Sequence, residues 1–135
     1  MIIGVTGSRT WVSRERISEA FDDAITDFGD PAYPNVIIVG SAGGADGLCK
    51  IEAIHRGWHP AQMMALWGYY GKPAGYVRDT AMVYLGMNAS CWLAFINECR
   101  DKDCTRKKPH DSHGATITMK AARKAGIEVR EYRNE

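Results

Sequence analysis

A glycine-rich stretch with the sequence GSAGGADG, residues 40–47, has the composition of a phosphate-binding turn. It follows an apolar run at residues 36–39 and begins a segment, residues 45–56, that is predicted to be helical. Glycines let a ligand approach the backbone closely, and the amides at a helix N-terminus attract anions. The stretch therefore predicts either an anion site or a turn that only reverses the chain, and its composition favours neither.

Several charged side chains are candidates for contact with a ligand. Arg9 directly follows the first apolar run, and its donors suit a phosphate group; the alternative is a surface salt bridge. Asp46 could accept hydrogen bonds from a ribose hydroxyl or a ligand amine, or could cap the helix that begins beside it. Lys72 could contact phosphate from its glycine-flanked loop or remain solvated. Arg78 could face the same site, or pair with Asp79 or with a second subunit.

Aromatic residues gather in one predicted loop, which contains Trp67, Tyr69 and Tyr70. Their rings could stack on a nucleobase, or could form a hydrophobic lid or a contact between subunits. His113 precedes a glycine at the start of the last predicted helix. It could donate to a phosphate or act as an acid or base, and a plain loop histidine is the alternative.

Cysteine and histidine, the usual zinc ligands, occur in the pattern Cys99-x4-Cys104-x5-His110-x2-His113. The spacing differs from the common zinc-finger patterns, and the residues between the four are highly charged. We therefore expect no metal and no other cofactor, with zinc at these four residues as the alternative. Zinc there would order the segment and would remove His113 from contact with a ligand.

These residues lie on segments that alternate between two patterns. Short apolar runs predict strands at residues 2–5, 35–39, 61–66, 90–96 and 127–132. Helices are predicted at residues 14–28, 45–56, 76–87 and 115–125. Ser13 can cap the first helix, whose apolar face consists of Ile17, Phe21, Ala24 and Phe28.

The alternation predicts one α/β domain over residues 1–135, an open five-stranded parallel sheet with helices on both faces. Ligands bind such sheets beyond the carboxyl ends of the strands, near the point where the strand order reverses. The loops after the first four strands all lie on that edge. Residues 97–113 are predicted to be a mobile basic insert, since residues 100–108 contain five Lys or Arg and two Asp.

The composition excludes several classes of protein. The net charge of +1 argues against a general nucleic-acid coat protein, although a local basic groove is compatible with it. No apolar run approaches the roughly 20 residues that span a bilayer. The chain starts directly as a strand without a signal-peptide pattern, so we expect a cytoplasmic protein with reduced thiols. Cys49 and Cys91 are predicted to be small core residues.

Four motifs follow one another along the chain: Gly7-Ser8-Arg9, Gly43-Gly44-Ala45-Asp46, Gly71-Lys72-Pro73-Ala74-Gly75 with Arg78-Asp79, and His113-Gly114-Ala115-Thr116. In this order and spacing they resemble the small YspA-type branch of the SLOG superfamily, which also contains the Smf/DprA proteins and the LOG phosphoribohydrolases. The resemblance implies a Rossmann-like sheet that recognises nucleotides or nucleotide-derived ligands. The chain has Arg78-Asp79 where the family usually has Arg-Asn. It also lacks the Pro-Gly-Gly-x-Gly-Thr-x-x-Glu motif of the LOG enzymes, with Thr118 and Met119 near the position of their glutamate.

The first functional hypothesis is a binding protein for a nucleotide-type small molecule. Its ligand-binding residues would be Gly7, Ser8, Arg9, Gly43, Gly44, Ala45, Asp46, Trp67, Lys72, Arg78, Gly114 and Thr116. The second is an enzyme that cleaves or transfers at an N-glycosidic bond, with Asp46 or Asp79 as the carboxylate and His113 as the donor. The third is single-stranded DNA binding through the basic insert and the aromatic loop. We also expect a homo-oligomer, a dimer or higher, and no membrane partner.

Overall fold

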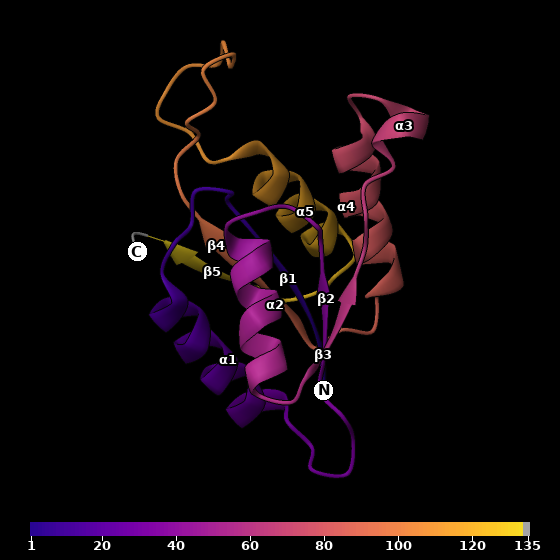
Figure 1. Cartoon of the computed structure of the whole chain (residues 1–135). Helices are drawn as coiled ribbons and strands as arrows, with labels where there is room; N and C mark the ends of the chain where they lie inside the picture. The colour runs from indigo at the N-terminus through magenta and orange to yellow at the C-terminus, as the bar shows by residue number, and fades with distance from the viewer. Residues whose placement is uncertain (134–135) are drawn as a thin grey trace.

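The computed structural model describes residues 1–133 and contains one five-stranded sheet (Figure 1). The strands are β1 (Ile2–Gly7), β2 (Val36–Val39), β3 (His59–Gln62), β4 (Cys91–Ile96) and β5 (Val129–Arg133). All neighbouring strands are parallel, in the order β3-β2-β1-β4-β5. The predicted α/β fold with an open parallel sheet is confirmed.

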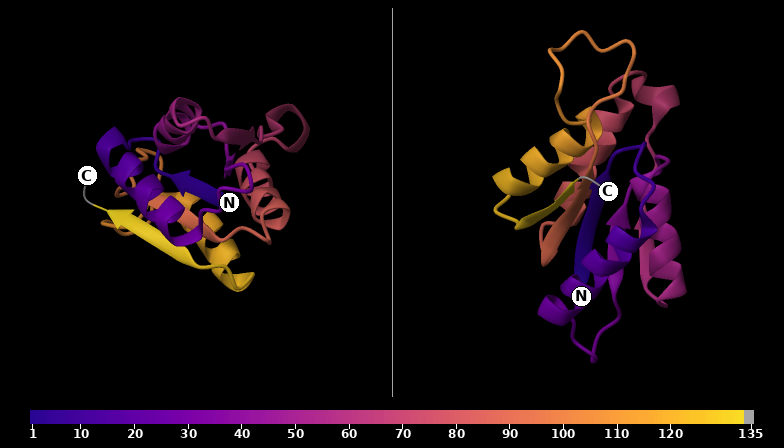
Figure 2. Two further views of the ribbon diagram at one scale, coloured as in Figure 1. Left: turned by 90° about the horizontal axis from the view of Figure 1, so that it is seen from below. Right: turned by 90° about the vertical axis from the view of Figure 1, so that its left-hand side faces the viewer.

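Helices cover both faces of the sheet (Figures 1 and 2). They are α1 (Arg14–Phe28), α2 (Ala45–His55), α3 (Trp67–Tyr70), α4 (Ala74–Leu85) and α5 (His113–Lys124). The apolar side chains of α1 and α2 share one buried cluster with the strands, and those of α4 and α5 pack in clusters on the opposite face. Within residues 1–133, no helix combines the length and apolar character needed to cross a membrane.

The core explains why the central strands are apolar throughout. All six residues of β4 are buried, because helices pack on both faces of this strand. On one face Phe95 contacts the ring of Trp11, whose indole nitrogen donates to the carbonyl of Ser13. On the other face Trp92 lies across Gly4, where a Cβ would come within 2.1 Å of the indole ring. Trp11 is therefore a core residue and is not available to stack on a ligand.

The first helix forms as its sequence predicts. The hydroxyl of Ser13 accepts a hydrogen bond from the amide of Arg16 and so caps α1. Ile17, Phe21 and Ala24 are buried against the sheet, because their spacing places them on one face of the helix. Cys49 and Cys91 are also buried in this core, as predicted.

Two elements differ from the sequence prediction. The third strand is His59–Gln62, earlier than the predicted residues 61–66, and it lies at the edge of the sheet. An edge strand tolerates Pro60, because one side of its backbone needs no hydrogen-bond donor. The aromatic loop contains the short helix α3, and α4 begins at Ala74, two residues before its predicted start.

Residues 97–112 connect β4 to α5 and project beyond the carboxyl edge of the sheet (Figure 1). The two ends of this insert pair with each other through an antiparallel bridge between Glu98 and Asp111. The amide of Cys99 donates to the carbonyl of His110 at 2.7 Å. These bonds join the base of the insert, so its two ends enter and leave the sheet edge together.

Candidate functional site

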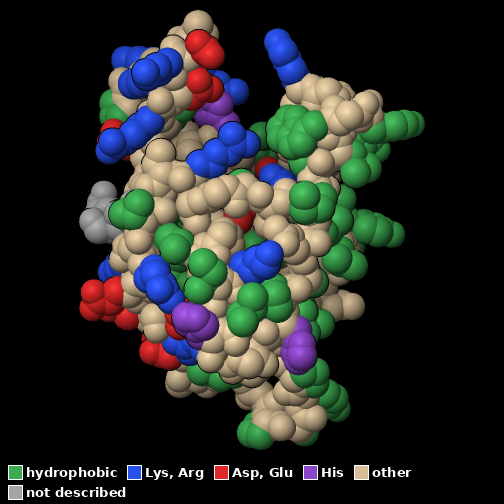
Figure 3. Space-filling model, in the orientation of Figure 1, with side chains coloured by type: hydrophobic (Ala, Val, Ile, Leu, Met, Phe, Trp, Pro, Cys, Tyr) green, Lys and Arg blue, Asp and Glu red, His purple; other side chains and the backbone are tan. Residues whose placement is uncertain are grey.

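A cavity of about 710 Å³ lies at the carboxyl edge of the sheet, where the strand order reverses between β1 and β4. Residues that follow β1, β2, β3 and β4 all line it, as the parallel topology predicts. Figure 3 shows this hollow at the top of the molecule, between the insert and the segment around α3, with charged side chains inside it. This cavity is the candidate functional site.

The turn after β1 is held by hydrogen bonds to other parts of the edge. The hydroxyl of Ser8 accepts from the amide of Asn97 at 2.8 Å and also bonds the hydroxyl of Ser112. The backbone amide of Ser8 donates to the carbonyl of Phe95, and its carbonyl accepts from the amide of Ala45. Ser8 therefore links β1 to the insert and to α2, and its own polar groups already have partners within the protein.

Two glycines of the predicted site allow close packing of α2 against this turn. A Cβ on Gly7 would come within 2.4 Å of the Cβ of Ala45. Gly44 has a φ of 66°, and a Cβ there would come within 2.3 Å of the Arg9 carbonyl oxygen. The glycines are thus required by the contact between the turn and the helix, whatever the site binds.

Three helices begin at the cavity wall. Asp46 of α2, Gly75 and Tyr76 of α4, and His113 and Gly114 of α5 all line it. None of these three helices has a side-chain hydrogen bond at its N-cap, whereas the side chain of Ser13 caps α1. The N-terminal ends of α2, α4 and α5 therefore make the cavity favourable for a negative group.

Asp46 lies in the first turn of α2 with its carboxylate turned back toward the glycine-rich stretch. It accepts a hydrogen bond from the amide of Ala42 at 3.1 Å. Burial raises the pKa of Asp46 from 3.8 to about 6, although Arg78 and Arg9 nearby favour its ionised form. A carboxyl group with this pKa is close to the range in which it can accept or release a proton near neutrality.

Arg78 and Asp79 form a buried ion pair on α4. The Arg78 Nε donates to the Asp79 carboxylate at 2.7 Å, and its guanidinium also donates to the hydroxyl of Ser41. Burial raises the pKa of Asp79, while hydrogen bonds from Arg78 and from Thr118 of α5 oppose that rise. Arg78 and Asp79 therefore pair with each other, one of the alternatives that the sequence left open. The bond from Arg78 to Ser41 joins α4 to the glycine-rich stretch.

Arg9 and Lys72 lie on the cavity wall with exposed side chains. Neither side chain has a hydrogen bond or ion pair with any residue in the range 1–133. The guanidinium of Arg9 is close enough to Asp46 and Asp79 to favour the ionised form of each. These two cations are therefore available to a ligand, whereas Arg78 is held by its protein partners.

The predicted site residues separate into two groups. Those that line the cavity are Gly7, Ser8, Arg9, Asp46, Lys72, Arg78 and Gly114, together with Asp79 and His113 of the enzymatic hypothesis. Those outside its lining are Gly43, Gly44, Ala45, Trp67 and Thr116. The hydroxyl of Thr116 donates to the carbonyl of Ser112 within α5. Trp67 lies over Gly75, with its ring 3.4 Å from the position of a Cβ there.

Sequence reasoning missed several residues of the site. Tyr76 lines the cavity from the first turn of α4, and Ser112 lines it beside Ser8. Thr118 is fully buried on α5, where its hydroxyl donates to the carbonyl of Gly114, and it lies close enough to Asp79 to lower the pKa of that carboxyl. Helical spacing could have found Tyr76, which lies three positions before Asp79 on one face of the helix, but the contact between α5 and α4 requires the tertiary structure.

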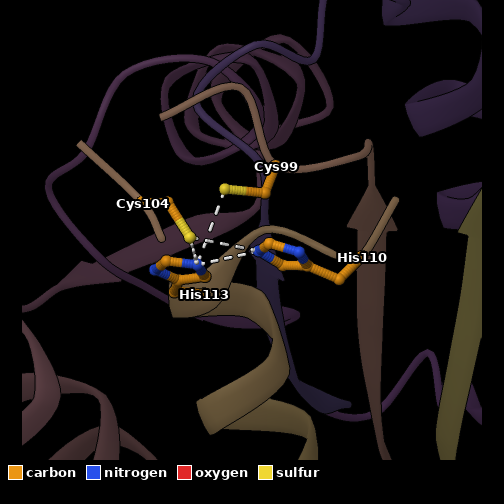
Figure 4. Close-up of side chains that lie close together, drawn as sticks. All are labelled: Cys99, Cys104, His110 and His113. Atoms are coloured by element: carbon orange, nitrogen blue, oxygen red, sulfur yellow. Dashed lines mark hydrogen bonds between the residues drawn. The ribbon is translucent and has the colours of Figure 1, made fainter. Parts of the chain in front are cut away.

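The structure brings Cys99, Cys104, His110 and His113 together at the base of the insert (Figure 4). Their sulfur and ring nitrogen atoms lie within 4.8 Å of one another. Cys99 and His113 also line the cavity. These four residues are the group in residues 1–133 that could hold a metal ion.

A second hollow of about 790 Å³ lies on the other side of the insert. Among its lining residues, Arg133 and Asp111 pair with each other at 2.7 and 2.8 Å. It contains none of the residues predicted to bind a nucleotide. The candidate site is therefore the cavity that contains Arg9.

Comparisons with known proteins find a relative from a phage and a solved structure with a similar fold. No protein family model matches the chain. It is 32% identical over 130 residues to the gene 61 protein of Mycobacterium phage D29, an alignment that covers 93% of this chain and 90% of that protein. It also resembles the crystal structure of DNA processing protein A (DprA) from Streptococcus pneumoniae, with a TM-score of 0.57 and 16% identity over 98% of this chain. The match spans 50% of the DprA chain, and it confirms the DprA-like Rossmann fold expected of a SLOG protein.

Proposed function

The chain belongs to the family of the gene 61 protein of Mycobacterium phage D29, and we propose that it binds a nucleotide or nucleotide-derived ligand at the carboxyl edge of its sheet. Within the SLOG-type fold we assign it to the small YspA-type branch, on the four motifs that the sequence carries in register. Its cavity of about 710 Å³ has the size that small-molecule sites usually have.

The observation that carries this proposal is the position of Arg9. Its guanidinium is exposed on the cavity wall and has no partner within residues 1–133, and three helices begin beside it. An arginine next to helix N-termini offers fixed donors and a favourable potential to a phosphate group. Lys72 adds a second cation on the same wall. In this proposal the phosphate binds Arg9 and the helix ends.

The carboxylates suit the rest of a nucleotide. Asp46 and Asp79 line the same cavity as Arg9, and an ionised carboxylate accepts hydrogen bonds from ribose hydroxyls. Tyr76 is about half exposed at the wall and offers a ring face to a base. The cavity therefore provides donors for phosphate, acceptors for the sugar and an apolar surface for the base.

A thermal-shift screen tests the proposal. Nucleoside mono- and diphosphates, dinucleotides and cyclic nucleotides are added to the whole chain, and one class should raise the melting temperature. A ligand at about 100 times its Kd raises the free energy of unfolding by about 2.7 kcal/mol when it binds only the folded state. No response to any of these compounds at millimolar concentration contradicts the proposal.

Two variants locate the bound phosphate. Arg9→Ala should weaken binding by roughly ten- to a hundredfold, because a hydrogen bond to a charged group contributes about 1.5–3 kcal/mol. Arg106→Ala removes an equally exposed guanidinium from the insert, outside the cavity lining, and should leave the affinity unchanged. An equal loss of nucleotide affinity in both variants would mean that the phosphate does not bind at Arg9.

A specific observation also favours a second candidate, cleavage at an N-glycosidic bond. Asp46, Asp79 and His113 line one cavity, and the pKa of Asp46 is raised to about 6 by burial. A carboxylate near the anomeric carbon could stabilise an oxocarbenium-like centre while His113 protonates the leaving base. Release of free base from a nucleoside monophosphate, lost in Asp46→Asn and in Asp79→Asn, would support this reaction. Persisting activity in both variants would refute the assignment.

Two further expectations are tested separately. A solved structure that this chain resembles is that of a DNA processing protein, and residues 100–108 of the insert are basic. A gel shift with single-stranded DNA at about 0.1 M salt therefore tests DNA binding. We also propose self-association, because Leu66, Trp67 and Tyr84 are among the exposed apolar side chains around α3 and α4. Light scattering coupled to size exclusion gives the oligomeric state, and a monomer at all concentrations contradicts that proposal.

A further inference from the structure

We propose that Cys99, Cys104, His110 and His113 form a structural Zn²⁺ site that holds the insert against the sheet edge. Cys99 and His110 lie near the two ends of the insert, Cys104 lies in its middle, and His113 is the first residue of α5. Both cysteine sulfurs and the Nε2 atoms of both histidines point toward one another (Figure 4). Two thiolates and two imidazoles are a common ligand set of structural zinc.

The spacing of the ligand atoms matches the size of a zinc tetrahedron. His113 Nε2 lies 3.5 Å from the Cys99 sulfur and 3.4 Å from the Cys104 sulfur. His110 Nε2 lies 3.5 Å from the Cys104 sulfur and 3.1 Å from His113 Nε2. With Zn–S near 2.3 Å and Zn–N near 2.0–2.1 Å, a tetrahedron has S–N edges of about 3.6 Å and N–N edges of about 3.3 Å. Four of the six edges therefore differ from these values by about 0.2 Å or less, and the other two, from the Cys99 sulfur to Cys104 and to His110, lie within 4.8 Å.

The surrounding backbone orients the ligands. The Nδ1 of His110 lies 2.9 Å from the carbonyl oxygen of Lys107, which can only accept, so Nδ1 carries the proton. The lone pair of His110 is therefore on Nε2, the atom that faces the other three residues. A ring nitrogen bonded to a carbonyl is the usual outer contact of a zinc-bound histidine.

The base of the insert fixes the distance between the two halves of the site. The amide of Cys99 donates to the carbonyl of His110, and the amide of Ser112 donates to the carbonyl of Asn97. These bonds place Cys99 beside His110 across eleven positions of sequence. The same pairing explains why the linear spacing does not match a zinc-finger pattern, since the ligands converge through a bridge between the ends of a loop.

Four protein ligands leave no open position on the ion, so this site is structural rather than catalytic. Binding of Zn²⁺ displaces the protons of the two thiols, and the two thiolates then balance the charge of the ion. His113 would be held by the ion and would not transfer a proton to a substrate, so zinc at this site and the glycosidic reaction with His113 as donor exclude each other. The site goes beyond the proposed nucleotide binding, which depends on Arg9 in the turn after β1.

Metal analysis of the whole chain, purified without chelator under reducing conditions, tests the proposal. We expect about one zinc ion per chain, as a four-ligand site holds one ion. Cys104→Ser and His110→Gln should each weaken Zn²⁺ binding by more than about a hundredfold, since loss of even an outer partner costs 10–100-fold. Cys49→Ala and His59→Gln remove the same residue types outside the cluster and should keep the zinc.

Cobalt gives a second readout that does not depend on the metal present at purification. Metal-free protein titrated with Co²⁺ should develop thiolate-to-cobalt charge transfer and the intense visible bands of a tetrahedral ion. Cys104→Ser should lose these bands, and circular dichroism should confirm that the variant is folded. Two results would each overturn the proposal: no uptake of Zn²⁺ or Co²⁺ by reduced protein, or equal zinc in Cys104→Ser and Cys49→Ala.

Discussion

The lining of the edge cavity comes from two parts of the chain, here called its two walls: the segments that follow β1, β2 and β3, and the insert with the start of α5. The two walls use their polar side chains in opposite ways. On one wall, Arg9 and Lys72 present cations that have no partner among residues 1–133. On the other, Cys99 and His113 point at each other, and with Cys104 and His110 they converge at the spacing of metal ligands. Charges that face a cavity without partners favour a soluble ligand, whereas soft ligands that converge favour an ion. The comparison therefore assigns a different kind of ligand to each wall.

The buried ion pair on α4 gives the largest expected effect on the first wall. Arg78→Ala should lower the free energy of unfolding by about 3–5 kcal/mol, because it leaves the Asp79 carboxylate buried without its cation. Lys72→Ala, on the same wall but exposed, should change it by less than about 0.5 kcal/mol. Urea unfolding measures both. If both variants lost a similar free energy of unfolding, the distinction between Arg78 as a structural cation and Lys72 as a free one would be contradicted.

Asp46→Asn should stabilise the protein at neutral pH. Burial raises the pKa of Asp46 from 3.8 to about 6, so the wild type loses stability as the pH rises through this window and the unfolded chain releases the proton first. Asparagine does not titrate. Relative to its value near pH 3.5, the stability of the variant minus that of wild type should grow by about 3 kcal/mol at pH 7.

Urea unfolding across this pH range measures the difference. Asp23→Asn, an exposed aspartate of α1, is the matched control and should give a small change of stability with pH. A difference between Asp46→Asn and wild type that does not vary with pH would show that Asp46 is not desolvated at the cavity wall. Asp46 would then have to be described as a solvated carboxylate of the cavity lining.

A smaller effect is expected at the residue that joins the two walls. Ser8→Ala removes the acceptor of the Asn97 amide and the partner of the Ser112 hydroxyl, and should cost about 1–2 kcal/mol of unfolding free energy. Ser112→Ala loses only one of these bonds and should cost about half as much. Denaturant unfolding compares the two, and a larger cost for Ser112→Ala would contradict the role given to Ser8.

Much of the fold could be predicted because its signals are local. Ser13 and the apolar spacing of Ile17 and Phe21 define α1 without any tertiary information. The strand β3 was misplaced because it contains Pro60 and is followed by more apolar residues at the edge of the sheet. The bounds of β3 therefore depend on its position at the edge of the sheet and not on the strand propensity of its residues.

The site was predictable to the extent that topology determines it. Parallel strands send their loops to one edge, so the convergence of Arg9, Asp46 and Arg78 on one cavity followed from the order of the strands. The contact of Thr118 with Asp79 depends on how α5 packs on α4, which no local pattern encodes. The approach of Cys99 to His110 depends on the bridge at the base of the insert.

Native mass spectrometry of the whole chain tests the central claim, that the two walls bind different ligands independently. The account predicts a chain with one bound zinc that gains the mass of one nucleotide when the compound with the largest thermal shift is added. Arg9→Ala should keep the zinc and lose the nucleotide, and Cys104→Ser should lose the zinc while Arg9 still supports nucleotide binding. If Arg9→Ala gained the nucleotide as wild type does, or if it lost the zinc as well, the division of the cavity into two sites would be contradicted.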